Sequence, residues 1–203
     1  RSGCKQETPD PPAPEAPKYV YGDSTTHPYL DIDDDGAIFC IDSSITKAEI
    51  PDYFKGIKVT SIRECAFLDC ESLESITIPN GVNSIEEGAF DNCKSLESVN
   101  IPNGVEFIGP SAFASCYELK SVVIPDSVTT IGYNAFYNCE SLESVTLPNG
   151  ITSIEDYTFY ASGLKSVIIP DGVESIGEGA FDACISLKSV VIPDSVTTIG
   201  DGA

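Results

Sequence analysis

Apolar side chains recur along this chain with a period of about 23 residues, beginning at Leu73. Each period opens with a leucine, followed three and five residues later by branched apolar residues, here Ile76 and Ile78. Further copies begin at Leu96, Leu119, Leu142, Leu164 and Leu187, in steps of 23, 23, 23, 22 and 23 residues. The missing residue is lost between Phe159 and Leu164. Such a period predicts a solenoid of stacked copies, because one copy alone has no second layer against which to bury its apolar side.

Within one copy, the alternation of the opening residues predicts a short strand. The leucine and the two branched residues are expected to point inward, whereas Ser75 and Thr77 point outward. Pro79 ends the strand, because proline has no N–H to donate to a neighbouring strand. Apolar residues between Ala89 and Cys93 then show helical spacing, which predicts a single helical turn on the opposite side of the coil.

The copies follow the pattern L-x-S-V-x-I-P-x-x-V-x-x-I-G-x-x-A-F-x-x-C over about residues 61–203. This pattern resembles that of the BspA-like leucine-rich-repeat family. The segment from Tyr29 to Ile62 also looks like that family's N-terminal cap, in which a hairpin covers the first repeat. We therefore expect an α/β repeat fold, a right-handed leucine-rich-repeat solenoid with parallel strands, short helical turns and an N-terminal hairpin cap. The resemblance further implies a bacterial surface or secreted protein used in adhesion or protein binding, without catalysis.

Three regions are expected along the chain: a Pro-rich tether at 1–17, the cap at 18–60, and the repeats at 61–203. Ser2-Gly3-Cys4 resembles the end of a lipoprotein signal, after which Cys4 would carry a lipid anchor. Against this, Arg1 stands where an apolar residue is normal, and an ordinary disordered tail is the alternative. The sixth copy stops at Ala203, before its expected phenylalanine, which predicts a C-terminal truncation or an edge that pairs with another chain.

Charge and composition reduce the number of possible function classes. The chain has 32 acidic and 11 basic residues, a formal net charge of −21, which makes a nucleic-acid partner improbable because phosphates would be repelled. No apolar stretch reaches the roughly 18 residues of a membrane span, so contact with a membrane is expected only through a lipid anchor. His27 is the single histidine, and no nucleophile–base pair, phosphate loop or convergent acid pair is found. We expect no enzyme, no catalytic residue and no cofactor.

Five cysteines occupy the same position of the repeat: Cys70, Cys93, Cys116, Cys139 and Cys184. In a parallel stack their Cβ atoms would lie about 4.8 Å apart. A disulfide needs about 3.5–4.5 Å and converging side chains, so these residues are predicted to be buried small hydrophobes. Ser162 stands at the cysteine position of its repeat, which agrees with a packing role. A zinc site is disfavoured because no close Cys–Cys or Cys–His pairing exists. Cys40 and Cys65 lie outside this ladder, and their redox state stays open.

An acidic run from Asp31 to Asp35, followed by Gly36, fits the first half of a calcium-binding EF-hand loop, with Asp42 at the twelfth place. Pro28 and the alternating sequence around the run argue against flanking helices. Asp-Gly between two strand-like runs, 29–32 and 37–41, favours a hairpin turn instead. We therefore expect a solvated acidic turn and no metal site.

The outward strand positions form the candidate partner-binding face. They are Ser98, Asn100, Ser121, Val123, Ser144, Thr146, Ser166, Ile168, Ser189 and Val191. The serines are uniform, whereas the second position becomes apolar toward the C-terminus. Exposed apolar side chains at these positions would form a docking patch, or they are only β-branched residues that suit strands, and both interpretations stay open. Acidic and basic residues mix at the flank of the strands, where opposite signs relieve repulsion.

Aromatic residues at otherwise variable positions are the second set of candidate contacts: Phe107, Tyr117, Tyr133, Tyr137 and Tyr160. Tyrosine and phenylalanine are good anchors at protein interfaces, and tyrosine is also a common sugar platform. As an alternative, these residues are surface filler on the convex side of the solenoid.

The leading interpretation is a non-enzymatic binding or adhesion protein, lipid-anchored and displayed at a bacterial cell surface or outer membrane. Its solenoid face would engage protein partners of a host or a neighbouring cell. Two alternatives remain open: a glycan-binding surface lipoprotein, and an architectural spacer that holds a further domain away from the membrane.

Overall fold

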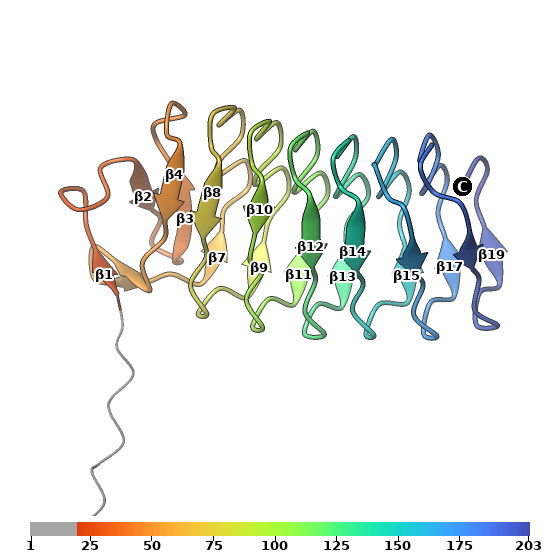
Figure 1. Cartoon of the computed structure of the whole chain (residues 1–203). Helices are drawn as coiled ribbons and strands as arrows, with labels where there is room; N and C mark the ends of the chain where they lie inside the picture. The colour runs from red at the N-terminus through yellow and green to blue at the C-terminus, as the bar shows by residue number, and fades with distance from the viewer. Residues whose placement is uncertain (1–19) are drawn as a thin grey trace, which may run out of the picture.

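The computed structural model describes residues 20–203, so the expected tether and Cys4 lie outside the described residues. The described chain is an elongated stack of coils with the N-terminal cap at one end (Figure 1). Each repeat contributes two short strands, and all strand pairs between successive repeats are parallel. The predicted solenoid with parallel strands is confirmed.

The first ladder contains the strands that open each repeat. Its members are β4 (Lys47–Glu49), β8 (Ser75–Thr77), β10 (Ser98–Val99), β12 (Ser121–Val123), β14 (Ser144–Thr146), β16 (Val167–Ile168) and β18 (Val190–Val191). They form one sheet from β4 to β14 and a second of β16 and β18. Inward residues such as Ile76 are buried while Thr77 is exposed, which is the alternation that the sequence predicts.

The second ladder follows the proline turn of each repeat. Its members are β7 (Ser61–Ile62), β9 (Ser84–Ile85), β11 (Phe107–Ile108), β13 (Thr130–Ile131), β15 (Ser153–Ile154), β17 (Ser175–Ile176) and β19 (Thr198–Ile199). The proline carbonyl closes the turn between the ladders: Pro79 accepts the Val82 amide at 3.1 Å, and Pro102 accepts that of Val105 at 3.1 Å.

The predicted helical turns are wrong. No segment of residues 20–203 is helical, and the fold is all-β rather than α/β. The expected helical segments form a wall of tight turns, here called the turn wall: residues 63–72, 86–95, 109–118, 132–141, 155–163 and 177–186. Whether the solenoid is right-handed, as expected, stays a prediction.

Hydrogen bonds between coils explain why these turns replace a helix. The amide of Phe90 donates to Ala112 of the next repeat at 2.7 Å, and the amide of Asn92 donates to Ala114 at 2.9 Å. In a helix the same amides would donate four residues back along their own chain. Gly88 and Asn92 also have φ near +60°, the left-handed region that interrupts a helix. A segment this short gains little as an isolated helix, whereas stacking gives every second amide a partner in the next coil.

A column of phenylalanines fills the core behind the turn wall. Phe67, Phe90, Phe113, Phe136 and Phe159 are fully buried, and successive rings stack with centroids 5.1–5.6 Å apart. Phe181 continues the stack at 5.6 Å from Phe159. The leucine and isoleucine columns complete one continuous core.

The cysteine ladder has the packing role that the sequence predicts. Each thiol of the inner rungs donates to the phenylalanine carbonyl of the preceding coil, as from Cys93 to Phe67 at 3.2 Å and from Cys139 to Phe113 at 3.2 Å. Ser162 fits the same column, with its hydroxyl 3.2 Å from the Cys184 sulfur. Burial raises the pKa of Cys93 and of Cys139 to about 12, so both thiols stay protonated at neutral pH.

A hairpin covers the first coil. Strands β2 (Leu30–Ile32) and β3 (Ala37–Cys40) are antiparallel, and β3 pairs in parallel with β7. In the acidic turn between them, a carboxylate oxygen of Asp33 accepts the amides of Asp35 at 3.1 Å and Ala37 at 2.9 Å. Gly36 has φ of +87°, a conformation that suits glycine. The run is therefore a hairpin turn rather than a loop between helices.

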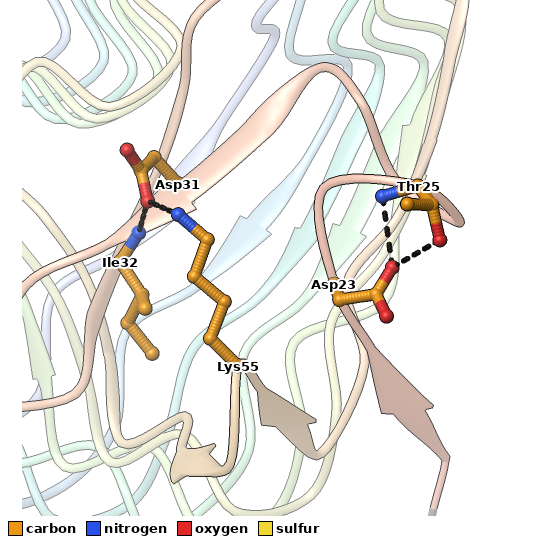
Figure 2. Close-up of polar contacts among 5 residues, drawn as sticks. All are labelled: Asp23, Thr25, Asp31, Ile32 and Lys55. Atoms are coloured by element: carbon orange, nitrogen blue, oxygen red, sulfur yellow. Dashed lines mark hydrogen bonds and ion pairs between the residues drawn. The ribbon is translucent and has the colours of Figure 1, made fainter.

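A smaller sheet lies beside this hairpin, with β1 (Tyr21–Gly22), β5 (Tyr53–Phe54) and β6 (Ile57–Lys58). The ammonium of Lys55 reaches across to Asp31 at 2.9 Å, and the carboxylate of Asp23 binds the amide and hydroxyl of Thr25 (Figure 2). The ion pair between Lys55 and Asp31 joins the β5–β6 hairpin to β2.

Candidate interaction surface

The strand face is the outward side of the first ladder. Its first column holds Ser75, Ser98, Ser121, Ser144, Ser166 and Ser189, and its second column holds Thr77, Asn100, Val123, Thr146, Ile168 and Val191. The serines from Ser75 to Ser144 are in register across paired strands, and an isolated bridge joins Ser144 to Ser166. Every candidate residue from Ser98 to Val191 on this face is exposed. The structure thus brings this predicted set together on one surface.

Apolar side chains stand out at the C-terminal end of this face. Ile168 and Val191 are 84% and 80% exposed, and they are direct partners across β16 and β18. Val123 is 66% exposed on the same column, paired with Thr146. Because these side chains point outward from a strand, folding of the repeat gives them no cover.

The charged flank of the strand face is largely neutralised by pairing between repeats. Lys120 lies 2.9 Å from Glu97, and Lys165 lies 2.7 Å from Glu143. The hydrogen bond from Lys120 to Glu97 raises the pKa of Lys120. Lys188 makes no ion pair within residues 20–203, so the apolar end of the face also carries an uncompensated positive charge.

A shallow hollow of about 480 Å³ lies beside the face where the 22-residue repeat lacks one residue. It is lined by Lys120, Glu140, Ser141, Glu143, Gly163, Lys165 and Ser186. The amide of Gly163 donates to Cys139, and a Cβ at Gly163 would overlap the carbonyl oxygen of Glu140. Glycine is therefore required for the shortened turn. The sequence locates the missing residue but gives no sign of the hollow.

The aromatic candidates lie elsewhere. Phe107 is half-buried in β11, on the second ladder, while Tyr117, Tyr133, Tyr137 and Tyr160 belong to the turn wall. The rings of Tyr137 and Tyr160 stack at 4.8 Å with an interplanar angle of 9°. Each therefore covers one face of the other, and neither is on the strand face.

Sequence reasoning missed Tyr157, which completes this aromatic group. Its ring meets Tyr160 edge-on at 6.0 Å, and its hydroxyl donates to Glu178. That hydrogen bond raises the pKa of Tyr157 to about 12. The spacing of three residues between Tyr157 and Tyr160, within a segment of expected turns, was a usable sign that the rings meet.

The described residues offer no arrangement for metal binding. Within residues 20–203 no group of three or more histidine, cysteine or acidic side chains is placed to hold a metal ion. In that range no helix is long and apolar enough to cross a membrane.

Comparison with known proteins decides the family. The model of the BspA type leucine-rich repeat region matches residues 36–162 and 106–203, with six copies. The chain belongs to this BspA-type family. A search of curated proteins finds no match.

Solved structures agree with the BspA-type fold. A leucine-rich repeat protein of T. pallidum is 25% identical with a TM-score of 0.59, over 84% of this chain and 82% of that chain. One from Eubacterium ventriosum is 22% identical with a TM-score of 0.55, over 83% of this chain and 52% of that chain. One from Bacteroides ovatus is 22% identical with a TM-score of 0.50, over 86% of this chain and 77% of that chain. The last two support the fold alone.

Proposed function

We propose that this chain is a non-enzymatic binding protein that engages a protein partner through the C-terminal half of its strand face. The exposed, paired apolar side chains of Ile168 and Val191 carry the proposal. Apart from them and Val123, the face is small and polar, and Lys188 stands beside them without an ion-pair partner in residues 20–203. An apolar centre with a polar and charged rim is the usual composition of a protein interface.

The glycan alternative is less well supported by the aromatic group. A sugar platform needs a free ring face, and the stacking of Tyr137 on Tyr160 leaves each ring only its outer face for that purpose. The edge-on ring contact of Tyr157 is also made within the group. These contacts between rings stabilise the turn wall. Sugar binding that depends on these tyrosines would favour the glycan alternative.

A photo-crosslinking residue placed at position 168 tests the proposal even while the partner is unidentified. The matched control places the same residue at position 68, where Leu68 is 40% exposed on the turn wall. Exposure to surface proteins of host or neighbouring cells should give a discrete crosslinked protein with the probe at 168 only. Equal products from both positions, or none from position 168, would contradict a partner on the strand face.

We further propose that the protein is displayed at a bacterial cell surface through a lipid on Cys4. The basis is the Ser2-Gly3-Cys4 pattern and the Pro-rich sequence behind it. Cells that express the gene should incorporate radiolabelled palmitate into the protein, and the Cys4→Ala variant should not. Absence of label from the unmodified protein would remove the anchor but leave the binding proposal intact.

A further inference from the structure

The 22-residue repeat interrupts the hydrogen bonding between coils. In the regular repeats, the amide of the second residue after the cysteine donates to the preceding coil, as from Ser141 to Tyr117 at 3.1 Å. The acceptor is always the first residue after the cysteine of that coil. In the 22-residue repeat only Gly163 stands between the cysteine position and Leu164, and its amide donates to Cys139 at 3.3 Å instead. The regular acceptor row is therefore broken in this coil.

Two backbone amides in the following coil lack partners. Ser186 and Lys188 hold the positions that Ser141 and Glu143 hold in a regular repeat. The amide of Glu143 donates to Lys120 at 3.0 Å, whereas in the described part of the chain neither Ser186 nor Lys188 has an acceptor for its amide. Because the equivalent amides point toward the preceding coil, these two donors face the shortened repeat. Backbone N–H groups that point into one concavity are suited to bind an anion.

Lysine side chains surround these amides. A hollow of about 430 Å³ adjoins the one at Gly163 and is lined by Lys165, Ile185, Ser186 and Lys188, without an acidic side chain. The register of β16 and β18 places the two lysines at equivalent positions of neighbouring coils, where like charges repel each other. Lys165 is also paired with Glu143, so Lys188 supplies the uncompensated charge. The positive charge is notable in a chain with 32 acidic and 11 basic residues.

An aliphatic side chain stands at the edge of this hollow. Ile185 is 95% exposed, at the position that Glu140 holds in the regular repeat before the shortened one. It is separated from Lys188 by only two residues, and Lys188 precedes the exposed Val191 of the strand face by three. The hollow is thus continuous in sequence with the apolar end of the strand face. A ligand that offers both an anionic and an aliphatic group would match this surface.

We propose that this hollow, here called the notch and formed by Gly163, Lys165, Ile185, Ser186 and Lys188, receives an acidic side chain from a segment of the protein partner. The inference rests on the proposed function and adds the chemistry of the partner. The carboxylate accepts the amides of Ser186 and Lys188 and lies beside the Lys188 ammonium. Hydrogen bonds of this charge-assisted kind are stronger than those between neutral groups. An aliphatic neighbour of the acidic residue packs against Ile185.

The test titrates the isotope-labelled full chain with a short peptide of alternating glutamate and leucine, followed by NMR of the backbone amides. The resonances of Ser186 and Lys188 should move, whereas that of Ser141, which is already bonded to Tyr117, should not. The matched peptide of alternating glutamine and leucine should bind about tenfold more weakly, because it lacks the charge.

Three variants locate the site. Lys188→Gln should weaken binding of the glutamate peptide by about fivefold. Lys47→Gln removes an equal charge from an exposed residue of β4, and should leave binding within about twofold. Insertion of one serine between Gly163 and Leu164 restores the period of 23 residues and should abolish binding. Because the two peptides are also compared on the unmodified chain, the test stands if the insertion variant fails to fold.

The outcomes separate this inference from the proposed function. Equal affinity for the two peptides, or unmoved amides of Ser186 and Lys188, would overturn the notch as a carboxylate site. Tighter binding of polygalacturonate than of the glutamate peptide, with the same amides moving, would make the notch a glycan site and also overturn the inference. In each case a discrete crosslink from position 168 would leave the proposed function intact, and failure of that crosslink alone would leave the peptide result standing.

Discussion

The strand face and the turn wall are built from the same repeats, yet they use their outward side chains differently. On the strand face, Ile168 and Val191 project into solvent from a regular parallel ladder. On the turn wall, Tyr137 and Tyr160 stack on each other, and the backbone visits left-handed φ at positions such as Ala161. The side chains of the wall thus hold coils together, and the strand face leaves its side chains available for recognition.

The largest difference in stability is expected between a substitution in the core behind the turn wall and one on the strand face. Phe113→Ala removes a fully buried ring from the middle of the phenylalanine stack. It should lower the free energy of unfolding by about 3–5 kcal/mol. Thr146→Ala, at an exposed position of the strand face, should change it by about 0.5 kcal/mol or less. Urea unfolding followed by circular dichroism measures both, and comparable losses would refute the contrast.

The shortened repeat offers the next test. Gly163→Ala introduces a Cβ that overlaps the Glu140 carbonyl. The coil must shift to relieve the overlap, at a cost of about 1–3 kcal/mol. Gly150→Ala is the matched control, because its Cβ would meet nothing closer than 3.6 Å. Equal unfolding midpoints for the two variants would show that the shortened turn tolerates a side chain.

Backbone strain in the turn wall predicts a stabilising change. Ala161 has φ of 52°, where an L-residue is disfavoured and glycine is not. Ala161→Gly should raise the free energy of unfolding by about 0.5–1 kcal/mol, since the relieved strain exceeds the added freedom of the unfolded chain. Ala112→Gly, at a residue without positive φ, should destabilise instead. A destabilised Ala161→Gly protein would argue against a strained wall.

The smallest effect on stability is expected for the ion pair between Lys55 and Asp31 in the cap, because both side chains are exposed. Hydrogen bonding to Lys55 lowers the pKa of Asp31, so the carboxylate is favoured in the folded protein. The stabilisation is present above the unfolded pKa of about 4 and is lost as the pH falls through the lower folded value. Lys55→Ala should return the Asp31 pKa toward its ordinary value, as measured by NMR titration. An unmoved Asp31 pKa would contradict the role of this ion pair.

The strand ladder was predictable because its signal is local and repeated. Leucine, the branched residues and the proline of each copy determine strand, alternation and turn, and the structure confirms each. The turn wall was not predictable from the same kind of pattern. Spacing at Ala89, Phe90 and Cys93 is shared by a helical turn and by a stacked turn, and only the hydrogen bonds to the next coil distinguish them.

The candidate surface shows the same division. The exposure of Ile168 and Val191 follows from alternation along a strand. In contrast, the hydrogen bond from the Tyr157 hydroxyl to Glu178 depends on how neighbouring coils meet in space. Periodicity predicts which residues occupy equivalent positions in successive repeats. It does not predict contacts between residues at non-equivalent positions.

The central claim is that the strand face, and not the turn wall, binds a protein partner. Its most direct test is the affinity of the crosslinked partner for two double variants, Ile168→Ser with Val191→Ser and Tyr137→Ser with Tyr160→Ser, after circular dichroism shows both folded. The strand-face pair should weaken binding by about tenfold or more, and the turn-wall pair should leave it within about twofold. Loss of binding in the tyrosine variant alone, or sugar binding that depends on those tyrosines, would contradict the account.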